Sequence, residues 1–361
     1  MATMVFTGGG SGGHIYPGLA VAQELRRLMP GVRIVWIGSR VPLDRTIVDA
    51  GGLADRFYGI PTGKLRRYFS LKTLADGFHI IAGFFVALAI LVREKPAALF
   101  SKGGYVSVPP CFAARLLDIP VFAHECDFSP GLATRLTARL AARIFVSYAE
   151  TARFFPPAIR KRLIVSGNPV RPAIYHGRAE AGRAFLGIPE RTGKPVLLVL
   201  GGSLGAREIN QTVEANLGWL CGRFIVAHQT GANPVPGPAD AVDYHRYEFF
   251  HAEMPDVLAA ADVVLSRAGA SALWEGAVCG KAMVLMPLST AGSRGDQIEN
   301  AAFFAAKGAA LVADGNTGIR DALEKMLDVD ERSRMGEAVR HIAGSEPPAT
   351  GIAKSLAGDL S

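Results

Sequence analysis

The sequence has few cysteines, and their spacing is that of neither a disulfide scaffold nor a zinc module. The four are Cys111, Cys126, Cys221 and Cys279, with no Cys-x-x-Cys pair. We therefore expect a reduced, intracellular protein. Disorder is excluded because 49% of the 361 residues are hydrophobic and 20% are charged. A chain of this length is expected to form about two domains.

Long blocks of like charge are also missing, as are the sequence signatures of RNA-recognition and zinc-finger modules. The 39 Lys and Arg outnumber the 32 Asp and Glu, which gives a net charge of +7. This balance favours anionic partners, namely phosphorylated substrates or an acidic membrane surface, and we expect no nucleic-acid partner. The N-terminus lacks a charged segment followed by a long apolar stretch, so a signal peptide is not expected.

Two segments of the chain follow the same plan. Residues 4–7 read as a buried strand, followed by the glycine turn 8–13 and a helix; residues 195–200, 201–205 and 206–220 repeat that order. Further apolar runs alternate with helical stretches between and after them. This alternation predicts an α/β protein with two doubly wound parallel sheets. We expect domains over 1–166 and 167–340, followed by a tail over 341–361.

Residues 77–92 form an apolar segment without formal charge. Basic residues flank it, with Lys64, Arg66 and Arg67 before it and Arg93 and Lys95 after it. The segment is too short for a typical spanning helix, which needs about 20 apolar residues. Two interpretations stay open: a helix packed into the first domain, or a helix whose apolar face lies in a membrane interface.

The first glycine turn matches Gly8-x-Gly10-x-x-Gly13, after a strand and before a helix. Such a turn lets the backbone approach a diphosphate, and the helix N-terminus offers free N–H groups. A dinucleotide site also needs an acid after the second strand. That strand is expected to end at residues 38–40, where no acid stands, so NAD is disfavoured and a diphosphate cradle is favoured.

Both glycine turns also match Gly-x-Ser-x-Gly, the nucleophile elbow of hydrolases. Two copies in one chain argue against a special nucleophile, so we disfavour a hydrolase. His14 follows the first turn at the start of a helix, where the dipole keeps imidazole neutral. It is either a general base or a packing residue.

Polar side chains follow two other predicted strands. The run His124-Glu125-Cys126-Asp127 stands where open α/β sheets bind ligands, and it lacks the second histidine of a zinc site. The run 266–271 opens a helix that carries Glu275. Small residues at a helix start suit phosphate, and a glutamate one turn later can accept two hydrogen bonds from a ribose diol.

Together these motifs resemble the MurG-type N-acetylglucosaminyltransferases of peptidoglycan synthesis. The resemblance covers roughly residues 4–315. It rests on motifs in the family's order and spacing: residues 7–22, 103–107, 124–125, 167–171, 202–206, 266–270, Glu275 and 296–301.

The resemblance implies a GT-B fold, with two Rossmann-like domains facing across a cleft, and places UDP-N-acetylglucosamine in the second domain. In that domain, Glu275 would hold the ribose diol, the backbone of Phe250 would read uracil, and Gln297 with Asp296 would bind the sugar hydroxyls. The implied donor-binding residues are Ser11, Gly12, Gly13, Arg171, Ser203, Phe250, Ala270, Ser271, Ala272, Leu273, Trp274, Glu275, Asp296 and Gln297.

The first domain would hold the lipid-linked acceptor. Its diphosphate would meet the turn 11–13 and the turn 103–105, and the implied acceptor-binding residues are Tyr105, Glu125 and Asp127. By this resemblance His14 is the base, and N-acetylglucosamine passes with inversion to the C4 hydroxyl of undecaprenyl-diphospho-N-acetylmuramoyl-pentapeptide. The tail would return as a helix to the first domain.

No metal or other cofactor is expected, because helix N-terminal N–H groups can stabilise the UDP leaving group and the sequence has no Asp-x-Asp pair. Because the acceptor's lipid stays in the bilayer, the resemblance also favours membrane association of residues 64–95. We expect a peripheral protein on the cytoplasmic face of the bacterial inner membrane, with an anionic membrane surface as partner.

Three positions depart from the family pattern. Cys126-Asp127 replaces Gln-Asn, and a carboxylate there would repel an anionic acceptor unless it is protonated or paired. Leu204 replaces a glutamine, and residues 288–296 replace a histidine-containing loop that helps to recognise the sugar.

Other functions remain open at this point. A diacylglycerol glycosyltransferase would share the fold and the membrane-facing first domain. A UDP-N-acetylglucosamine 2-epimerase would share the fold without any need for lipid. A non-catalytic sugar-nucleotide-binding scaffold is disfavoured because His14, Glu275 and Gln297 are all present.

Overall fold

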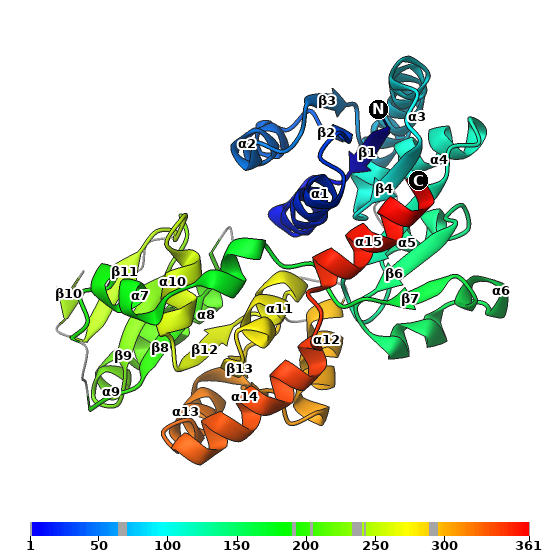
Figure 1. The fold of residues 1–361 in the computed structure, drawn as a ribbon. Helices are drawn as coiled ribbons and strands as arrows, with labels where there is room; N and C mark the ends of the chain where they lie inside the picture. Colours follow the sequence, from blue (N-terminus) through cyan, green and yellow to red (C-terminus); the bar gives the residue numbers. More distant parts are fainter. Residues whose placement is uncertain are drawn as a thin grey trace. The chain divides into compact units, whose positions relative to one another are not determined.

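The computed structural model describes residues 2–63, 71–189, 193–202, 205–232, 240–241, 243–288 and 295–360. These residues form two compact units (Figure 1). Unit 1 comprises residues 1–171 and 346–361, and unit 2 comprises residues 172–345. The chain therefore leaves unit 1 slightly later than the sequence suggested and returns to it at Glu346.

Unit 1 is built on a seven-stranded parallel sheet with the order β3-β2-β1-β4-β5-β6-β7. Its strands are β1 (Thr3–Thr7), β2 (Arg33–Ser39), β3 (Arg56–Ile60), β4 (Ala98–Ser101), β5 (Val121–Glu125), β6 (Arg143–Val146) and β7 (Leu163–Val165). The strand order reverses between β1 and β4, which pair directly. Such a switch point is where doubly wound sheets bind ligands, outside the carboxyl ends of the strands.

Both faces of the unit 1 sheet are covered, because side chains alternate along each strand. Met4 and Phe6 of β1 pack with helix α1 and the C-terminal helix α15, whereas Val5 between them packs with α3 and α4. The helices are α1 (Tyr16–Leu28), α2 (Pro42–Gly51), α3 (Leu71–Glu94), α4 (Val108–Leu116), α5 (Leu132–Thr137), α6 (Pro157–Arg160) and α15 (Pro348–Leu360). Short 3-10 helices are η1 (Gly12–His14), η2 (Tyr105–Ser107) and η3 (Ala149–Phe154).

Helix α15 ties the end of the chain to unit 1. Ile352, Ala353 and Leu356 are fully buried in the core that α1 also lines. At the edge of this contact, Thr350 Oγ1 donates to Glu24 Oε2 over 3.0 Å. The tail thus lies on unit 1 as a helix, as the family resemblance implied.

Helix α3 has one buried and one exposed apolar face. Ala87, Ile90 and Leu91 are buried in the unit 1 core, while Phe78, Ile81, Phe85 and Val92 are 53–68% exposed. The stretch Asp76–Glu94 is long and apolar enough to cross a membrane by length and composition, with 22% of it buried in the protein. The buried face makes α3 part of unit 1, and the membrane-interface interpretation of residues 77–92 stays a prediction.

Unit 2 repeats the plan of unit 1. Its seven-stranded sheet has the order β10-β11-β9-β8-β12-β13-β14, parallel except for the β10–β11 pair. The strands are β8 (Val196–Leu200), β9 (Ile225–Gln229), β10 (Asp240–Ala241), β11 (Tyr244–Tyr247), β12 (Val263–Ser266), β13 (Ala282–Leu285) and β14 (Leu311–Val312). The order reverses between β8 and β12. The prediction of two doubly wound parallel-sheet domains is therefore confirmed.

The helices of unit 2 enclose a second, separate core. They are α7 (Ala179–Phe185), α8 (Arg207–Ala215), α9 (Leu217–Cys221), α10 (Met254–Ala260), α11 (Ala270–Val278), α12 (Asp296–Ala306), α13 (Gly315–Lys325) and α14 (Val329–Ala343), with the 3-10 helix η4 (Pro172–His176). Ile209 and Val213 of α8 pack with Leu197 and Val199 of β8. Helix α14 begins with a side-chain cap, since Asp328 accepts from the amides of Asp330 and Glu331.

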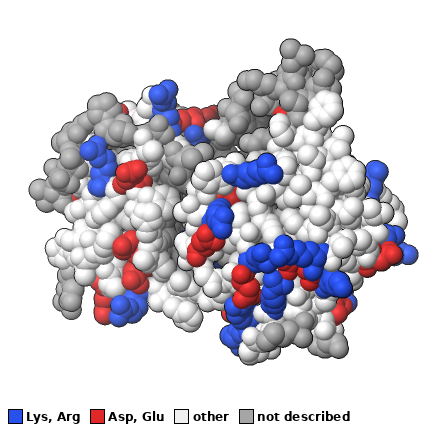
Figure 2. Space-filling model, turned by 90° about the horizontal axis from the view of Figure 1, so that it is seen from above, with Lys and Arg blue, Asp and Glu red and all other residues white. Residues whose placement is uncertain are grey.

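The described surface carries mixed charge. Figure 2 shows Lys and Arg side chains next to Asp and Glu on the face in view, separated by wide uncharged areas. On this face the excess of positive charge does not form a single uninterrupted basic patch.

Candidate active site

The two switch points carry the same local elements. In unit 1, β1 leads into the turn 8–13 and β4 leads through Lys102 into the turn 103–104. In unit 2, β8 leads into the turn that begins at Gly201, and β12 leads through Arg267 into Gly269, which caps α11. Each unit thus places a glycine turn and a basic residue side by side at the carboxyl edge of its sheet.

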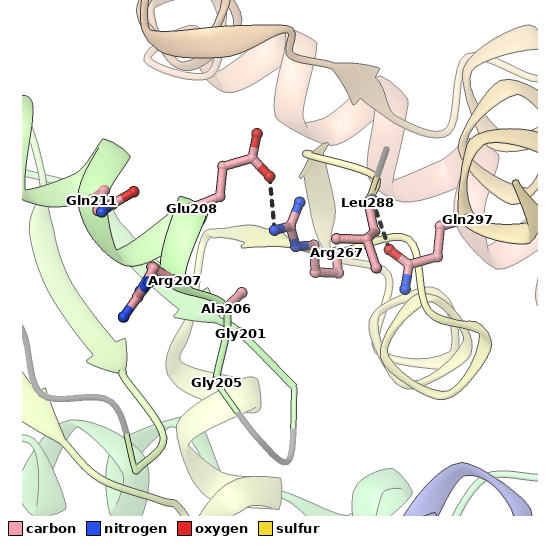
Figure 3. Close-up of a pocket in the computed structure, with 9 residues that line it drawn as sticks. All are labelled: Gly201, Gly205, Ala206, Arg207, Glu208, Gln211, Arg267, Leu288 and Gln297. Carbon is pink, nitrogen blue, oxygen red and sulfur yellow. Dashed lines mark hydrogen bonds and ion pairs between the residues drawn. The ribbon is translucent and has the colours of Figure 1, made fainter. Parts of the chain in front are cut away.

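The switch point of unit 2 opens into a pocket of about 570 Å³ (Figure 3). The glycine turn and the start of α8 form one wall, and the ends of β12 and β13 with α12 form the other. The lining residues are Gly201, Gly205, Ala206, Arg207, Glu208, Gln211, Arg267, Leu288 and Gln297. Of these, Gln297 was predicted from the sequence.

Arg267 lies at the centre of this pocket, as Figure 3 shows. Its guanidinium donates to the carbonyl oxygen of Met286 over 3.0 Å and forms an ion pair with Glu208 at 2.9 Å. The arginine side chain is 12% exposed and the glutamate side chain 59% exposed. The arginine is therefore held by the backbone on one side and by an exposed surface carboxylate on the other. An incoming anion can replace that carboxylate.

Gln297 is oriented by the backbone that follows β13. Its Oε1 accepts from the amide of Leu288 over 2.9 Å, which leaves the Nε2 donors for a ligand. Gln297 stands in the first turn of α12, which is fixed below by the buried Asn300, whose Nδ2 donates to the carbonyl of Ala268. Asp296 begins the same helix and is half-buried.

Helix α11 begins at Ala270 without a side-chain cap, so its first N–H groups are available to an anion. Ser271, Ala272 and Glu275 are half-buried on this helix. Leu273 and Trp274 are 0% and 1% exposed and belong to the interior. These two positions could therefore contact a diphosphate only through their backbone, and their assignment to the donor stays a prediction.

Phe250 lies at the end of the adjacent β11 segment, but its amide is engaged. The N–H donates to Gln229 Oε1 over 2.9 Å, so a base recognised here would meet the carbonyl of Phe250. A buried network lies beneath: His228 Nδ1 accepts from the Tyr244 hydroxyl and Nε2 donates to Asn210 Oδ1. Burial, with Arg246 nearby, lowers the pKa of His228 to about 4, so its imidazole is neutral.

The switch point of unit 1 brings His14 and Tyr105 together from two loops. A Cβ on Gly104 (φ +77°) would come within 2.9 Å of the His14 ring, and one on Gly10 (φ +80°) within 2.7 Å of the Tyr105 ring. Glycine is needed at both positions for the backbone angle and for the contact. Burial, with Asp44 nearby, raises the pKa of Tyr105, so its hydroxyl stays protonated. Ser11 and Gly13 are exposed at the mouth of the first turn, and Gly12 is buried.

Asp44 controls the shape of this turn and was missed from the sequence. Its carboxylate accepts from the Gly10 amide at 2.8 and 3.1 Å, from the Ser39 amide at 2.9 Å and from the Ser39 hydroxyl at 2.6 Å, and it is fully buried. No acid stands at residues 38–40, as the sequence showed, but Asp44 in the first turn of α2 reaches the glycine turn. Its carboxylate binds the Gly10 amide, whereas the acid of a dinucleotide enzyme binds a ribose.

Glu125 and Asp127 lie at the end of β5. The Glu125 carboxylate, 5% exposed, accepts from the amides of Asp127 and Gly131 at 3.1 Å each, so it shapes the loop that follows. Glu125, Cys126 and Asp127 place possible metal ligands within 4.8 Å of one another. They do not fit a metal ion, because burial raises the pKa of the Cys126 thiol to about 12 and Lys102 lies beside it.

Arg171 and Ser203 were both assigned to the donor. The guanidinium of Arg171 stacks on the Tyr16 ring at 5.1 Å, and that ring lies against Gly12, so in unit 1 this arginine flanks the first glycine turn. Ser203 lies outside the described residues, as do Leu204 and residues 289–294 of the departing loop.

Comparison with known proteins bears out the architecture. Residues 4–146 match the glycosyltransferase family 28 N-terminal domain, and residues 196–347 match its C-terminal domain. The chain belongs to glycosyltransferase family 28. The first matched segment contains the switch point of unit 1, and the second contains the switch point of unit 2.

Curated relatives extend over nearly the whole chain. A protein of Treponema denticola named UDP-N-acetylglucosamine–N-acetylmuramyl-(pentapeptide) pyrophosphoryl-undecaprenol N-acetylglucosamine transferase is 48% identical, with 96% of this chain and 95% of that protein covered. A Bacillus cereus protein with the same name, numbered 2, is 39% identical over 93% of both chains. The chain is thus a hexosyltransferase of the MurG type.

Solved structures agree on the fold. The crystal structure of Acinetobacter baumannii MurG superposes with a TM-score of 0.72 at 25% identity, covering 98% of each chain. A UDP-N-acetylglucosamine 2-epimerase from Neisseria meningitidis superposes at 0.65 with 16% identity, covering 100% of this chain and 99% of that one, a likeness of fold alone. The curated relatives therefore favour the transferase over the epimerase.

Proposed function

We propose that this glycosyltransferase moves N-acetylglucosamine from UDP-N-acetylglucosamine to the C4 hydroxyl of undecaprenyl-diphospho-N-acetylmuramoyl-pentapeptide. The observation that carries the proposal is the 48% identity over 96% of the chain to a transferase named for these substrates. The pocket of unit 2 supports it, because that pocket combines a glycine turn, a guanidinium and an amide side chain at a switch point.

The donor binds at unit 2 in this proposal. Its diphosphate meets the uncapped start of α11 and displaces Glu208 from Arg267. Glu275, one turn into α11, accepts from the ribose diol, and Gln297 donates through Nε2 to a sugar hydroxyl. The leaving UDP is stabilised by N–H groups and a guanidinium, so we propose that the reaction needs no metal ion.

The acceptor binds at unit 1, where His14 serves as the general base. Its ring lies against Gly104, at the junction of the two glycine turns. From there it takes the proton of the C4 hydroxyl as that oxygen attacks the anomeric carbon in a single displacement, with inversion. Tyr105, with a raised pKa, acts as a hydrogen-bond donor rather than as a base.

We also propose that the exposed face of α3 lies in the interface of an anionic membrane. Phe78, Ile81, Phe85 and Val92 form a row at helical spacing, and Phe112 and Leu116 of the neighbouring α4 are exposed as well. Arg93 lies in the last turn of α3 and Lys95 follows the helix, where they can meet acidic headgroups. Such a peripheral attachment to the cytoplasmic face brings unit 1 to a lipid-linked substrate.

The transfer assay tests the substrates. Purified protein in detergent is given radiolabelled UDP-N-acetylglucosamine and the undecaprenyl-linked acceptor, with EDTA present. Labelled lipid product is the expected result. Binding of the nucleotide sugar without product would contradict the acceptor, and product that disappears with EDTA would contradict metal independence.

Sedimentation with liposomes tests the membrane face. The double change Ile81→Gln with Phe85→Gln should reduce sedimentation with vesicles of anionic phospholipid, because it removes two exposed apolar side chains from the interface. Leu132→Gln is the matched control, since Leu132 is 54% exposed on α5 of the same unit. Equal loss in both variants would contradict a specific role for α3.

A further inference from the structure

Lys102 is a buried basic residue at the switch point of unit 1 that the proposed mechanism does not use. It follows β4 directly, and its amide donates to the Thr7 carbonyl over 2.9 Å, which fixes it beside the first glycine turn. A Cβ on Gly8 would lie 3.3 Å from the Lys102 Cβ. The side chain is 1% exposed although it belongs to the residue type that is most seldom buried.

No nitrogen or oxygen atom among the described residues accepts a hydrogen bond from the Lys102 amine, which interacts instead with the Cys126 thiol. Its electrostatic neighbours are His124 and Cys126. Neither offers a negative charge, because burial lowers the pKa of His124 well below its ordinary value and raises that of the Cys126 thiol to about 12. A buried, incompletely paired ammonium lowers stability, so its presence calls for a compensating role.

Carboxylates at the same sheet edge explain why a cation is needed there. Asp44 and Glu125 are buried, and both accept from backbone amides of the surrounding loops. Asp127, half-buried, adds a third negative charge. These groups would repel a diphosphate at the turns 8–13 and 103–105, and in a low-dielectric interior a nearby cation offsets them strongly.

Unit 2 supplies an independent parallel. Lys102 follows Ser101 at the end of β4, and Arg267 follows Ser266 at the end of β12, the strand that pairs with the first strand of its own sheet. Arg267 lines the pocket of unit 2. In both units, therefore, a basic residue directly follows the strand that pairs with the first strand of the sheet.

We propose that Lys102 is a positioning residue for the diphosphate of the lipid-linked acceptor. Its charge, which lies beside His124 and Cys126 at the carboxyl edge of the sheet, makes this edge attractive to a diphosphate despite the carboxylates around it. The inference rests on the proposed function and adds to it the group that provides electrostatic attraction for the acceptor.

The main test is Lys102→Met, which keeps the length of the side chain and removes the charge. The KM for the lipid-linked acceptor should rise about 10-fold or more, while the KM for UDP-N-acetylglucosamine stays unchanged. The melting temperature should stay equal or rise by about 2–4 °C, because an unpaired buried charge is lost. An unchanged acceptor KM, or an equal rise in both KM values, would overturn the proposal.

Lys281→Met is the matched control. Lys281 is also largely buried, but its amine donates to the carbonyls of Ala259 and Ala261 at 2.7 and 2.8 Å. Removing it should lower the melting temperature and leave both KM values unchanged. Lys102→Gln serves as the second variant if Lys102→Met does not fold, with the same kinetic outcomes expected.

A binding measurement separates this inference from the proposed function. With unit 2 saturated by UDP, inorganic pyrophosphate should raise the melting temperature of the unmodified protein and not that of the Lys102→Met variant; inorganic phosphate should have less effect on both. An equal pyrophosphate shift in both proteins would overturn the role of Lys102, even if the transfer assay fails. Transfer by the unmodified protein with an unchanged acceptor KM in the variant would leave the function standing and remove the inference.

Discussion

The two switch points differ in how they hold their charges. In unit 2 the cation Arg267 is partly exposed in an open pocket, and its carboxylate partner Glu208 is on the surface. In unit 1 Lys102, Asp44 and Glu125 are all buried, and the glycine turn is pinned through Gly10. The same topology thus gives two kinds of site. In unit 2 the ion pair is accessible to a ligand, whereas in unit 1 burial holds the charged groups in place. Fixed groups suit a reacting centre, because they need no rearrangement as charge develops.

The largest expected effect tests whether unit 1 supplies the general base. His14→Ala should reduce transfer by about 10²–10⁴-fold, the usual contribution of a general base. Calorimetric binding of UDP should stay unchanged, because the proposed donor pocket lies in unit 2. Retained turnover would remove His14 as the base.

The second prediction tests whether Asp44 holds the glycine turn 8–13 in place. Asp44→Ala leaves the buried donors of Gly10 and Ser39 without their acceptor, which should lower the free energy of unfolding by about 3 kcal/mol. Asp49→Ala is the control, since Asp49 is an exposed residue of the same helix. Chemical denaturation measures both. Similar losses in the two variants would show that the turn does not depend on Asp44.

The third prediction concerns acid, which should weaken both units through buried neutral histidines. The pKa of His228 is about 4 in the folded protein against an ordinary 6.5. The unfolded chain therefore binds the proton first as pH falls, and stability that is full above pH 6.5 is lost between pH 6.5 and 4, by about 3 kcal/mol. The pKa of His124 is also lowered by burial, so His124 should add a further loss of stability as the pH falls.

Denaturation curves at a series of pH values measure this loss. His228→Asn should flatten the slope between pH 6.5 and 4, whereas His251→Asn, at an exposed position, should leave it unchanged. A slope that persists in the His228 variant would assign the acid sensitivity to other groups.

The smallest expected effect concerns the ion pair of unit 2. Arg267→Met should raise the KM for UDP-N-acetylglucosamine about 10-fold and leave that for the acceptor unchanged, the reverse of Lys102→Met. Glu208→Gln should lower the donor KM a few-fold, since the guanidinium no longer has to exchange a partner. Steady-state kinetics with each substrate varied in turn would show the contrast; a change in the acceptor KM in the Arg267 variant would contradict the division between the units.

The sequence by itself determined the two parallel-sheet domains and several parts of the site. The glycine turns, His14, Tyr105 and Gln297 could be found because local patterns mark the end of a strand and the start of a helix. A motif does not show which helix face is buried, so only the structure placed the side chains of Leu273 and Trp274 in the interior and left Glu275 half-buried.

Only the tertiary structure determined which charged side chains lie together at each switch point. Asp44 lies 34 positions from Gly10, and Lys102 reaches the first glycine turn because β4 pairs with β1 across an α/β crossover. Arg267 and Glu208 meet because β12 pairs with β8. Such pairings depend on strand order, which local periodicity does not contain, and burial then fixes how strongly each charge acts.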